Sequence, residues 1–180
     1  MTFRETELGG VFLLELERRE DERGFFARAW SREELEERGL STQLEQCNLA
    51  YNEREGTLRG LHFQLPPYED VKIVRCTAGG VFDVVVDVRR DSPTYLRWLG
   101  VELSAANRLA LYIPAGCAHG YQTLAPGTET FYLHSAPYAP GYEGGLRWDD
   151  PALSIHWPPA AVRVISDRDR SWPDVGQAAH

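Results

Sequence analysis

The chain has 180 residues, enough for one substantial hydrophobic core but too few for two ordinary domains, so we expect one domain over residues 1–180. Its 16 glycines, 11 prolines and 43% hydrophobic content fit a turn-rich β protein better than a helical bundle or a disordered chain. The formal net charge of −8 excludes a broad nucleic-acid or anionic-membrane surface, because such surfaces need clustered Lys and Arg.

The N-terminal region is predicted to contain two strands joined by a polar turn. Residues 11–16 are typical of a strand, and residues 21–24, Asp-Glu-Arg-Gly, form a turn that leads into a second strand over residues 25–30. Arg23 therefore lies where a turn enters a strand.

One short helix is predicted after these strands. Ser31 and Glu34 have the spacing of a capping box ahead of residues 35–38, and Gly39 is placed to end the helix.

The central segment, residues 44–135, predicts a barrel or sandwich. Short runs of Val, Ile, Leu, Thr and Tyr are separated by Gly, Pro, Asn or Asp at strand-length intervals. The clearest strand is 81–89, which alternates with period two. After Pro137 the composition turns to Pro, Gly, Trp and Asp, and we expect this C-terminal segment to pack over the barrel because its tryptophans need burial.

The cysteines and the N-terminus indicate where the protein works. Cys47, Cys76 and Cys117 are widely spaced, so neither a disulfide framework nor a structural zinc site is indicated, and we expect reduced, buried thiols. The first 16 residues mix charges among apolar side chains, and no stretch approaches membrane-spanning length. These features predict a cytoplasmic location and no membrane partner.

His62 is the first candidate for chemistry. On a strand it shares a face with Gly60 and Gln64, and the glycine leaves room for a ligand. Taken alone, this segment favours a structural, hydrogen-bonded imidazole over a catalytic one.

Lys72 and Tyr132 are further candidates. Lys72 shares a face with Val74 and Cys76, so it either points into the barrel, where it needs an anion or a developing oxyanion, or lies on a solvated face. Tyr132 shares a face with His134, and a tyrosine hydroxyl inside a barrel can donate a proton, although most buried tyrosines are structural. Asp169 lies in a polar run that periodicity alone would place in solvent.

Residues 114–120 match the Pro-x-Gly-x-x-His half of the cupin signature and end in His119-Gly120. The other half supplies His-x-His and a glutamate in metal-binding cupins, but here it is His62-Phe63-Gln64. Two imidazoles without a carboxylate make a poor metal site, which puts a metal-dependent oxygenase or isomerase behind a metal-free mechanism.

Eight motifs occur in a set order between Arg23 and Asp169: RGLHFQ, KIVRC, VFDVVVDVR, SPTY, W-x-G-V-x-LSA-x-NR, IPAGCAHG, Y-x-P-x-x-E-G and WDDP-x-L-x-I-x-WP. Together they resemble the dTDP-4-dehydrorhamnose 3,5-epimerase family of deoxysugar nucleotide biosynthesis. The resemblance implies a jelly-roll barrel, so we expect an all-β, cupin-type fold that also contains the short N-terminal helix and the C-terminal segment predicted above. It also implies a homodimer that inverts C3 and C5 of a nucleotide-linked 4-keto-6-deoxyhexose without metal or organic cofactor.

Roles carry over from the resemblance by position. His62 would be the base, Asp169 would hydrogen-bond it, Lys72 would stabilise the enolate oxygen, and Tyr132 would return a proton from the opposite face. The implied substrate contacts are Arg23, Phe26, Arg28, Gln46, Asn48, Arg59, His119, Tyr138, Glu143 and Arg168. Arg23 and Arg59 suit the diphosphate, and Tyr138 and Phe26 the nucleobase.

The sequence departs from the family pattern at Arg28, where a glutamate is usual, and at Cys47, where an aspartate is usual. It also lacks the usual lysine after Tyr132. Two alternatives stay open: an epimerase that inverts only C3 or only C5, and a sugar-nucleotide-binding cupin without activity, which would be expected to lack His62, Tyr132 or Asp169.

Overall fold

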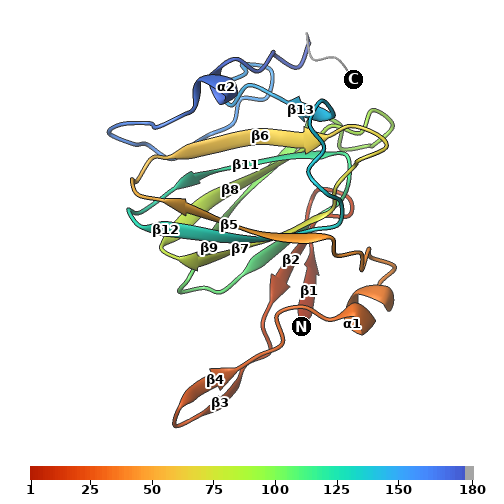
Figure 1. Cartoon of the computed structure of the whole chain (residues 1–180), viewed down its shortest axis with the longest axis vertical. Coiled ribbons are helices and arrows are strands. Elements are labelled where there is room, and N and C mark those ends of the chain that lie inside the picture. Colours follow the sequence, from red (N-terminus) through yellow and green to blue (C-terminus); the bar gives the residue numbers. More distant parts are fainter. Residues whose placement is uncertain (177–180) are drawn as a thin grey trace.

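The computed structural model describes residues 1–176, which form two facing antiparallel sheets (Figure 1). The first sheet has the strand order β1 (Thr2–Glu5), β2 (Phe12–Glu15), β10 (Ala110–Ile113), β7 (Lys72–Ala78), β12 (Thr128–His134) and β5 (Gln46–Asn52). The second has the order β13 (Glu143–Gly145), β6 (Leu58–Gln64), β11 (Cys117–Thr123), β8 (Gly80–Asp87) and β9 (Trp98–Ser104). The predicted cupin-type jelly roll is confirmed.

Strand β8 shows how the sequence pattern builds the core. Val81 and Val85 face the interior between the sheets, whereas Val84 and Val86 belong to a second buried cluster on the outer face. Both faces are buried, which explains why apolar residues occupy both sets of alternating positions. The strand ends at Asp87, two residues earlier than predicted, because the Asp87 carboxylate accepts the N–H of Arg89 and turns the chain.

The C-terminal segment covers the outer face of the second sheet, as predicted. Leu146, Leu153 and Val175 are buried there against Leu61 and Val84, and Trp157 packs at the margin of the same cluster. The short helix α2 (Asp167–Arg170) lies beside β6 (Figure 1). This packing carries a distant part of the chain to the strand that holds His62.

Helix α1 (Arg32–Glu36) covers the outer face of the first sheet, where Leu35 packs among Leu14, Ile73 and Tyr112. The Ser31 hydroxyl accepts the N–H of Glu34, as the capping motif predicts. The reciprocal bond does not form, because the Glu34 carboxylate pairs with the N-terminal amine and with Arg28.

Strands β3 (Arg19–Asp21) and β4 (Gly24–Phe26) form a separate two-stranded hairpin that projects away from the barrel (Figure 1). The predicted strand over residues 25–30 was too long, because β3 begins at Arg19, opposite Phe26, and offers no partner beyond it. Phe26 is 76% exposed, which is unusual for an aromatic side chain in a described strand.

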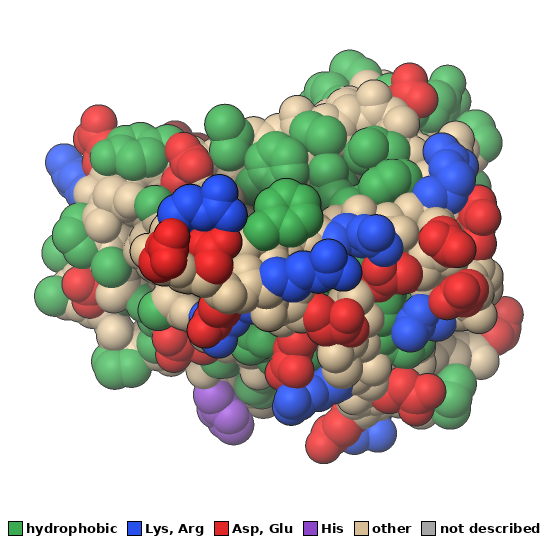
Figure 2. Space-filling model, turned by 90° about the horizontal axis from the view of Figure 1, so that it is seen from below, with side chains coloured by type: hydrophobic (Ala, Val, Ile, Leu, Met, Phe, Trp, Pro, Cys, Tyr) green, Lys and Arg blue, Asp and Glu red, His purple; other side chains and the backbone are tan. Residues whose placement is uncertain are grey.

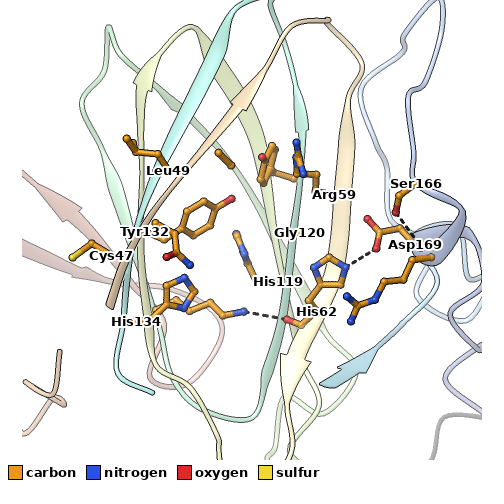
Figure 3. A pocket seen from close by; sticks show the side chains of 15 residues that line it. Cys47, Leu49, Arg59, His62, His119, Gly120, Tyr132, His134, Ser166 and Asp169 are labelled. Atoms are coloured by element: carbon orange, nitrogen blue, oxygen red, sulfur yellow. Dashed lines mark hydrogen bonds and ion pairs between the residues drawn. The ribbon is translucent and has the colours of Figure 1, made fainter. Parts of the chain in front are cut away.

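Cys76 and Cys117 are buried as predicted, but Cys47 is exposed. Cys47 lies on β5, the edge strand of the first sheet, among the residues drawn in Figure 3. Among residues 1–176, no helix is long and apolar enough to cross a membrane.

Candidate active site

A cavity of about 650 Å³ lies between the two sheets and is lined from β5, β6, β7, β11, β12 and the α2 region. A second cavity of about 160 Å³ adjoins it. Five residues line both and mark their junction: Asn48, His62, Lys72, His134 and Arg168. Polar side chains therefore concentrate where the two cavities meet, as is usual for a ligand site.

His62 on β6 forms a pair with Asp169 on α2 (Figure 3), and His62 Nε2 lies 2.6 Å from Asp169 Oδ1. The backbone N–H of Gly60 donates to the other carboxylate oxygen at 3.2 Å. Burial alone would raise the pKa of Asp169, but the hydrogen bond and charge of His62 lower it below its usual value. An ionised carboxylate binds Nε2–H, so Nδ1 is the ring nitrogen left to accept a proton.

Only glycine fits at position 60, two residues before His62 on β6. The φ of Gly60 is +124°, and a Cβ atom at this position would lie 2.5 Å from Gly120 Cα on β11. Any larger residue would push these strands apart. The close approach sets His62 opposite His119 in the sheet.

Lys72 on β7 points into the barrel, which settles the alternative left open by the sequence. Its ammonium is buried and donates to the backbone carbonyl oxygen of His62 at 3.3 Å. Burial lowers the pKa of Lys72, and the negative charges of Asp70 and Asp83 oppose that fall. The amine is therefore a buried donor next to His62.

Tyr132 on β12 lies across the cavity from His62, because β12 belongs to the first sheet and β6 to the second (Figure 3). Burial raises the pKa of Tyr132 well above its usual value of 10, so the phenol keeps its proton at neutral pH. The Thr130 hydroxyl donates to the phenol oxygen at 3.2 Å. This arrangement suits a proton donor.

His119 on β11 forms another buried pair, with its Nε2 at 2.9 Å from each oxygen of Asp83. Asp83 was not among the predicted site residues. The period of β8 could have found it, because Asp83 shares the inward face with Val81 and Val85.

The other predicted substrate contacts divide into three groups. Asn48, Arg59, His119 and Arg168 line the main cavity, and Gln46, Tyr138 and Glu143 line the smaller one. Arg23, Phe26 and Arg28 lie on or after the β3–β4 hairpin, away from both cavities within one chain. Arg23 pairs with Asp21 at 2.5 Å, and Arg28 with Glu34 at 2.9 Å. Their contact with substrate stays a prediction.

Gln64 has a positioning role that sequence reasoning missed. Its amide oxygen accepts the N–H of Ala139 at 2.9 Å, and its amide nitrogen donates to the carbonyl oxygens of Tyr68 and Pro137. These bonds tie the loop that carries Tyr138 to β6. Within residues 1–176, no three His, Cys, Asp or Glu side chains are grouped so that they could hold a metal ion.

An imidazole paired with a carboxylate, a buried lysine and a protonated tyrosine on the opposite wall define a jelly-roll enzyme that moves protons by acid–base chemistry. The family model described as dTDP-4-dehydrorhamnose 3,5-epimerase matches residues 5–177. The curated dTDP-4-dehydrorhamnose 3,5-epimerase of Sinorhizobium fredii is 41% identical over 97% of this chain and 90% of its own length.

Solved structures agree with this assignment. An enzyme from Legionella pneumophila in complex with dTDP-4-keto-L-rhamnose has a TM-score of 0.92 and 33% identity, covering 98% of this chain and 93% of its own. A 3'-monoepimerase from Streptomyces bikiniensis in complex with dTDP-quinovose has a TM-score of 0.89 and 32% identity, covering 95% and 86%. The chain belongs to the dTDP-4-dehydrorhamnose 3,5-epimerase family.

Proposed function

We propose that this protein inverts C3 and C5 of dTDP-4-dehydro-6-deoxy-D-glucose to give dTDP-4-dehydro-L-rhamnose. One observation carries the proposal: His62 and Tyr132 face one cavity from opposite sheets. Inversion needs a proton to leave one face of a carbon and return to the other, and a single base on one wall would mainly restore the starting configuration.

The ketone at C4 makes the protons on C3 and C5 acidic. His62 Nδ1 takes the proton, the C–H electron pair forms a carbon–carbon double bond, and the carbonyl electrons move to the oxygen. Lys72 donates a hydrogen bond that stabilises this enolate oxygen. Tyr132 then protonates the carbon from the opposite face as the carbonyl re-forms, and the phenolate regains a proton from water while His62 loses its own. These steps occur once at C3 and once at C5.

Nucleotide recognition is assigned to the neighbouring side chains. Arg59 lines the main cavity, and its Nε donates to Asn52 Oδ1 at 2.9 Å, which leaves its other donors for a diphosphate. Arg168 at the cavity junction is paired with Glu143. Tyr138 is largely exposed at the smaller cavity and is suited to stack on a nucleobase.

A homodimer would explain why the β3–β4 hairpin projects away from the barrel of its own chain. Arg23 and Phe26 are predicted to bind substrate, yet both are exposed and neither lines the main or the smaller cavity of its own chain. Figure 2 shows hydrophobic side chains gathered beside a row of Lys and Arg side chains on the face seen from below. We therefore expect the hairpin of each copy to reach the cavity of a second copy.

Mixing two inactive proteins tests the dimer. If a His62→Asn variant and an Arg23→Ala/Phe26→Ala variant exchange subunits, a mixed dimer contains one cavity with both sets of residues intact. Activity recovered on mixing supports the shared site. Light scattering and tag capture show whether mixed dimers form. Mixed dimers that form but recover no activity would refute the shared site.

The function itself is tested with dTDP-4-keto-6-deoxyglucose in heavy water, locating deuterium by NMR. Deuterium at both C3 and C5 with inverted product is expected. Label at C3 alone would instead identify a monoepimerase like the structural neighbour from Streptomyces bikiniensis. No label would refute epimerisation of this nucleotide sugar.

A further inference from the structure

His134 at the end of β12 is paired with Asp70, in the segment that precedes β7. His134 Nδ1 lies 2.6 Å from Asp70 Oδ2, and the other carboxylate oxygen accepts the backbone N–H groups of Ser135 at 3.0 Å and Ala136 at 3.2 Å. Asp70 is buried, and buried carboxyl oxygens need hydrogen-bond donors such as these. The short contact between His134 Nδ1 and Asp70 fixes the orientation of the imidazole.

The fixed imidazole stacks against the proposed proton donor. His134 and Tyr132 lie two residues apart on one face of β12, with ring centroids 5.7 Å apart and ring planes at 21°. From another side the His119 ring meets Tyr132 edge-on, with centroids 6.1 Å apart. The phenol thus lies between two imidazoles, and each is tied to a buried carboxylate, Asp70 for His134 and Asp83 for His119.

The Tyr132 hydroxyl lies near the Tyr121 hydroxyl, and its hydrogen bond with Thr130 is a local one. The phenol oxygen accepts it from the Thr130 hydroxyl, two residues away on the same strand. A proton donor must hold its O–H in line with the accepting carbon, and a displacement of about 1 Å can cost about a hundredfold in rate. Ring packing on both sides restricts the rotation that would cause such a displacement.

We propose that His134, anchored by Asp70, is a positioning residue that holds the Tyr132 phenol at the angle required for protonation. This role rests on the proposed function, because it concerns the proton donor of that reaction. His134 acts through Tyr132 and leaves proton removal by His62 untouched. Its loss therefore separates two events that the wild-type enzyme couples, exchange of the substrate proton and inversion of the carbon.

The test compares these two events in heavy water for wild type and His134→Ala. Deuterium enters the substrate whenever His62 removes and returns a proton, whereas inverted product forms only when Tyr132 delivers one. We expect inversion by His134→Ala to fall about ten- to a hundredfold. Exchange with retained configuration and the KM stay within about twofold of wild type, since the base and the binding groups are unchanged.

Two further variants separate the ring from its anchor. His134→Phe keeps an aromatic ring beside Tyr132 and should recover part of the lost inversion. His134→Asn keeps an N–H near the Nδ1 position for Asp70 but has no ring, so it should behave like His134→Ala. The His134→Asn variant also keeps the test decisive if His134→Ala fails to fold. His156→Ala is the matched control, because His156 is an exposed imidazole on the C-terminal segment, and its ratio of inversion to exchange should equal that of wild type.

Each other outcome overturns the inference. Equal losses of exchange and inversion, or a raised KM with an unchanged ratio, would place His134 on the base or the substrate instead. An unchanged ratio in His134→Ala and His134→Asn would remove any role. These failures differ from failure of the proposed function, in which wild type itself exchanges no deuterium.

Discussion

Two buried carboxylates in this barrel, Asp169 and Asp87, have opposite surroundings. The Asp87 carboxylate, at the end of β8, has all its hydrogen-bond donors in the segment that follows the strand. It accepts hydrogen bonds from Arg89, from Ser92 Oγ at 2.5 Å and from Thr94 Oγ1 at 2.6 Å. Asp169 instead binds the imidazole of His62, which lines the cavity. The other ring nitrogen of His62 has no hydrogen-bond partner among the described residues.

This difference distinguishes a carboxylate that stabilises the fold from one that belongs to the candidate active site. Both carboxylates have lowered pKa values, so a shifted pKa alone does not identify a catalytic group. What distinguishes the Asp169 side is that its hydrogen-bond chain ends in the cavity. Burial of a polar group with one atom left for a ligand indicates a site, whereas full saturation within the chain indicates stability.

The largest expected effect comes from Asp169→Asn. The asparagine would take the Gly60 N–H on its oxygen and turn its NH₂ toward His62 Nε2, which would leave the proton on Nδ1 and remove the base. By analogy with the same change in a serine-protease triad, we expect activity to fall about a thousandfold or more. Initial rates of deuterium exchange measure this loss, and a variant within about tenfold of wild type would contradict the tautomer assigned to His62.

A smaller and more selective effect is expected from Tyr132→Phe. Removing the hydroxyl deletes the proton donor but leaves the base, so inversion should fall about a hundredfold while exchange falls much less. NMR of the recovered substrate measures both quantities in one sample. Parallel loss of both would show that the tyrosine acts before protonation.

Asp87→Asn should change stability and leave catalysis near the wild-type level. The hydrogen bonds from Arg89, Ser92 and Thr94 outweigh the effect of burial and lower the pKa of Asp87 from 3.8 to about 2. This shift corresponds to about 2 kcal/mol of stability. Because the folded pKa is depressed, the contribution is fully present above about pH 4 and is lost as the pH falls toward about 2.

Urea unfolding of wild type and Asp87→Asn at several pH values checks the stability prediction. The difference in the free energy of unfolding should be about 2 kcal/mol at about pH 7 and should shrink below about pH 4. A difference that stays constant down to about pH 3 would assign the loss to packing rather than to the charge.

Local periodicity predicted several features of the site from the sequence. Alternation placed Tyr132 and His134 on one face of their strand, and it left Lys72 with two alternatives that the structure resolved in favour of the interior. The role of Asp169 came from the family resemblance alone, because its burial depends on the C-terminal segment folding back over β6.

Other parts of the site lay beyond local reasoning. The pairing of Asp70 with His134 joins residues 64 positions apart, and no periodicity reports such a contact. The place of the β3–β4 hairpin was missed for a related reason, since a turn and two short strands define its local form but not what it packs against. The site is held together largely by hydrogen bonds between segments that are far apart in the sequence. Local sequence patterns do not predict such contacts.

The central claim is that His62 removes the substrate proton, and the most direct measurement is deuterium exchange at C3 and C5 of dTDP-4-keto-6-deoxyglucose by His62→Asn in heavy water. The variant should fold, bind the nucleotide sugar and exchange neither position above the rate without enzyme. Exchange at the wild-type rate by a folded His62→Asn protein would contradict the assignment and move the base elsewhere in the cavity.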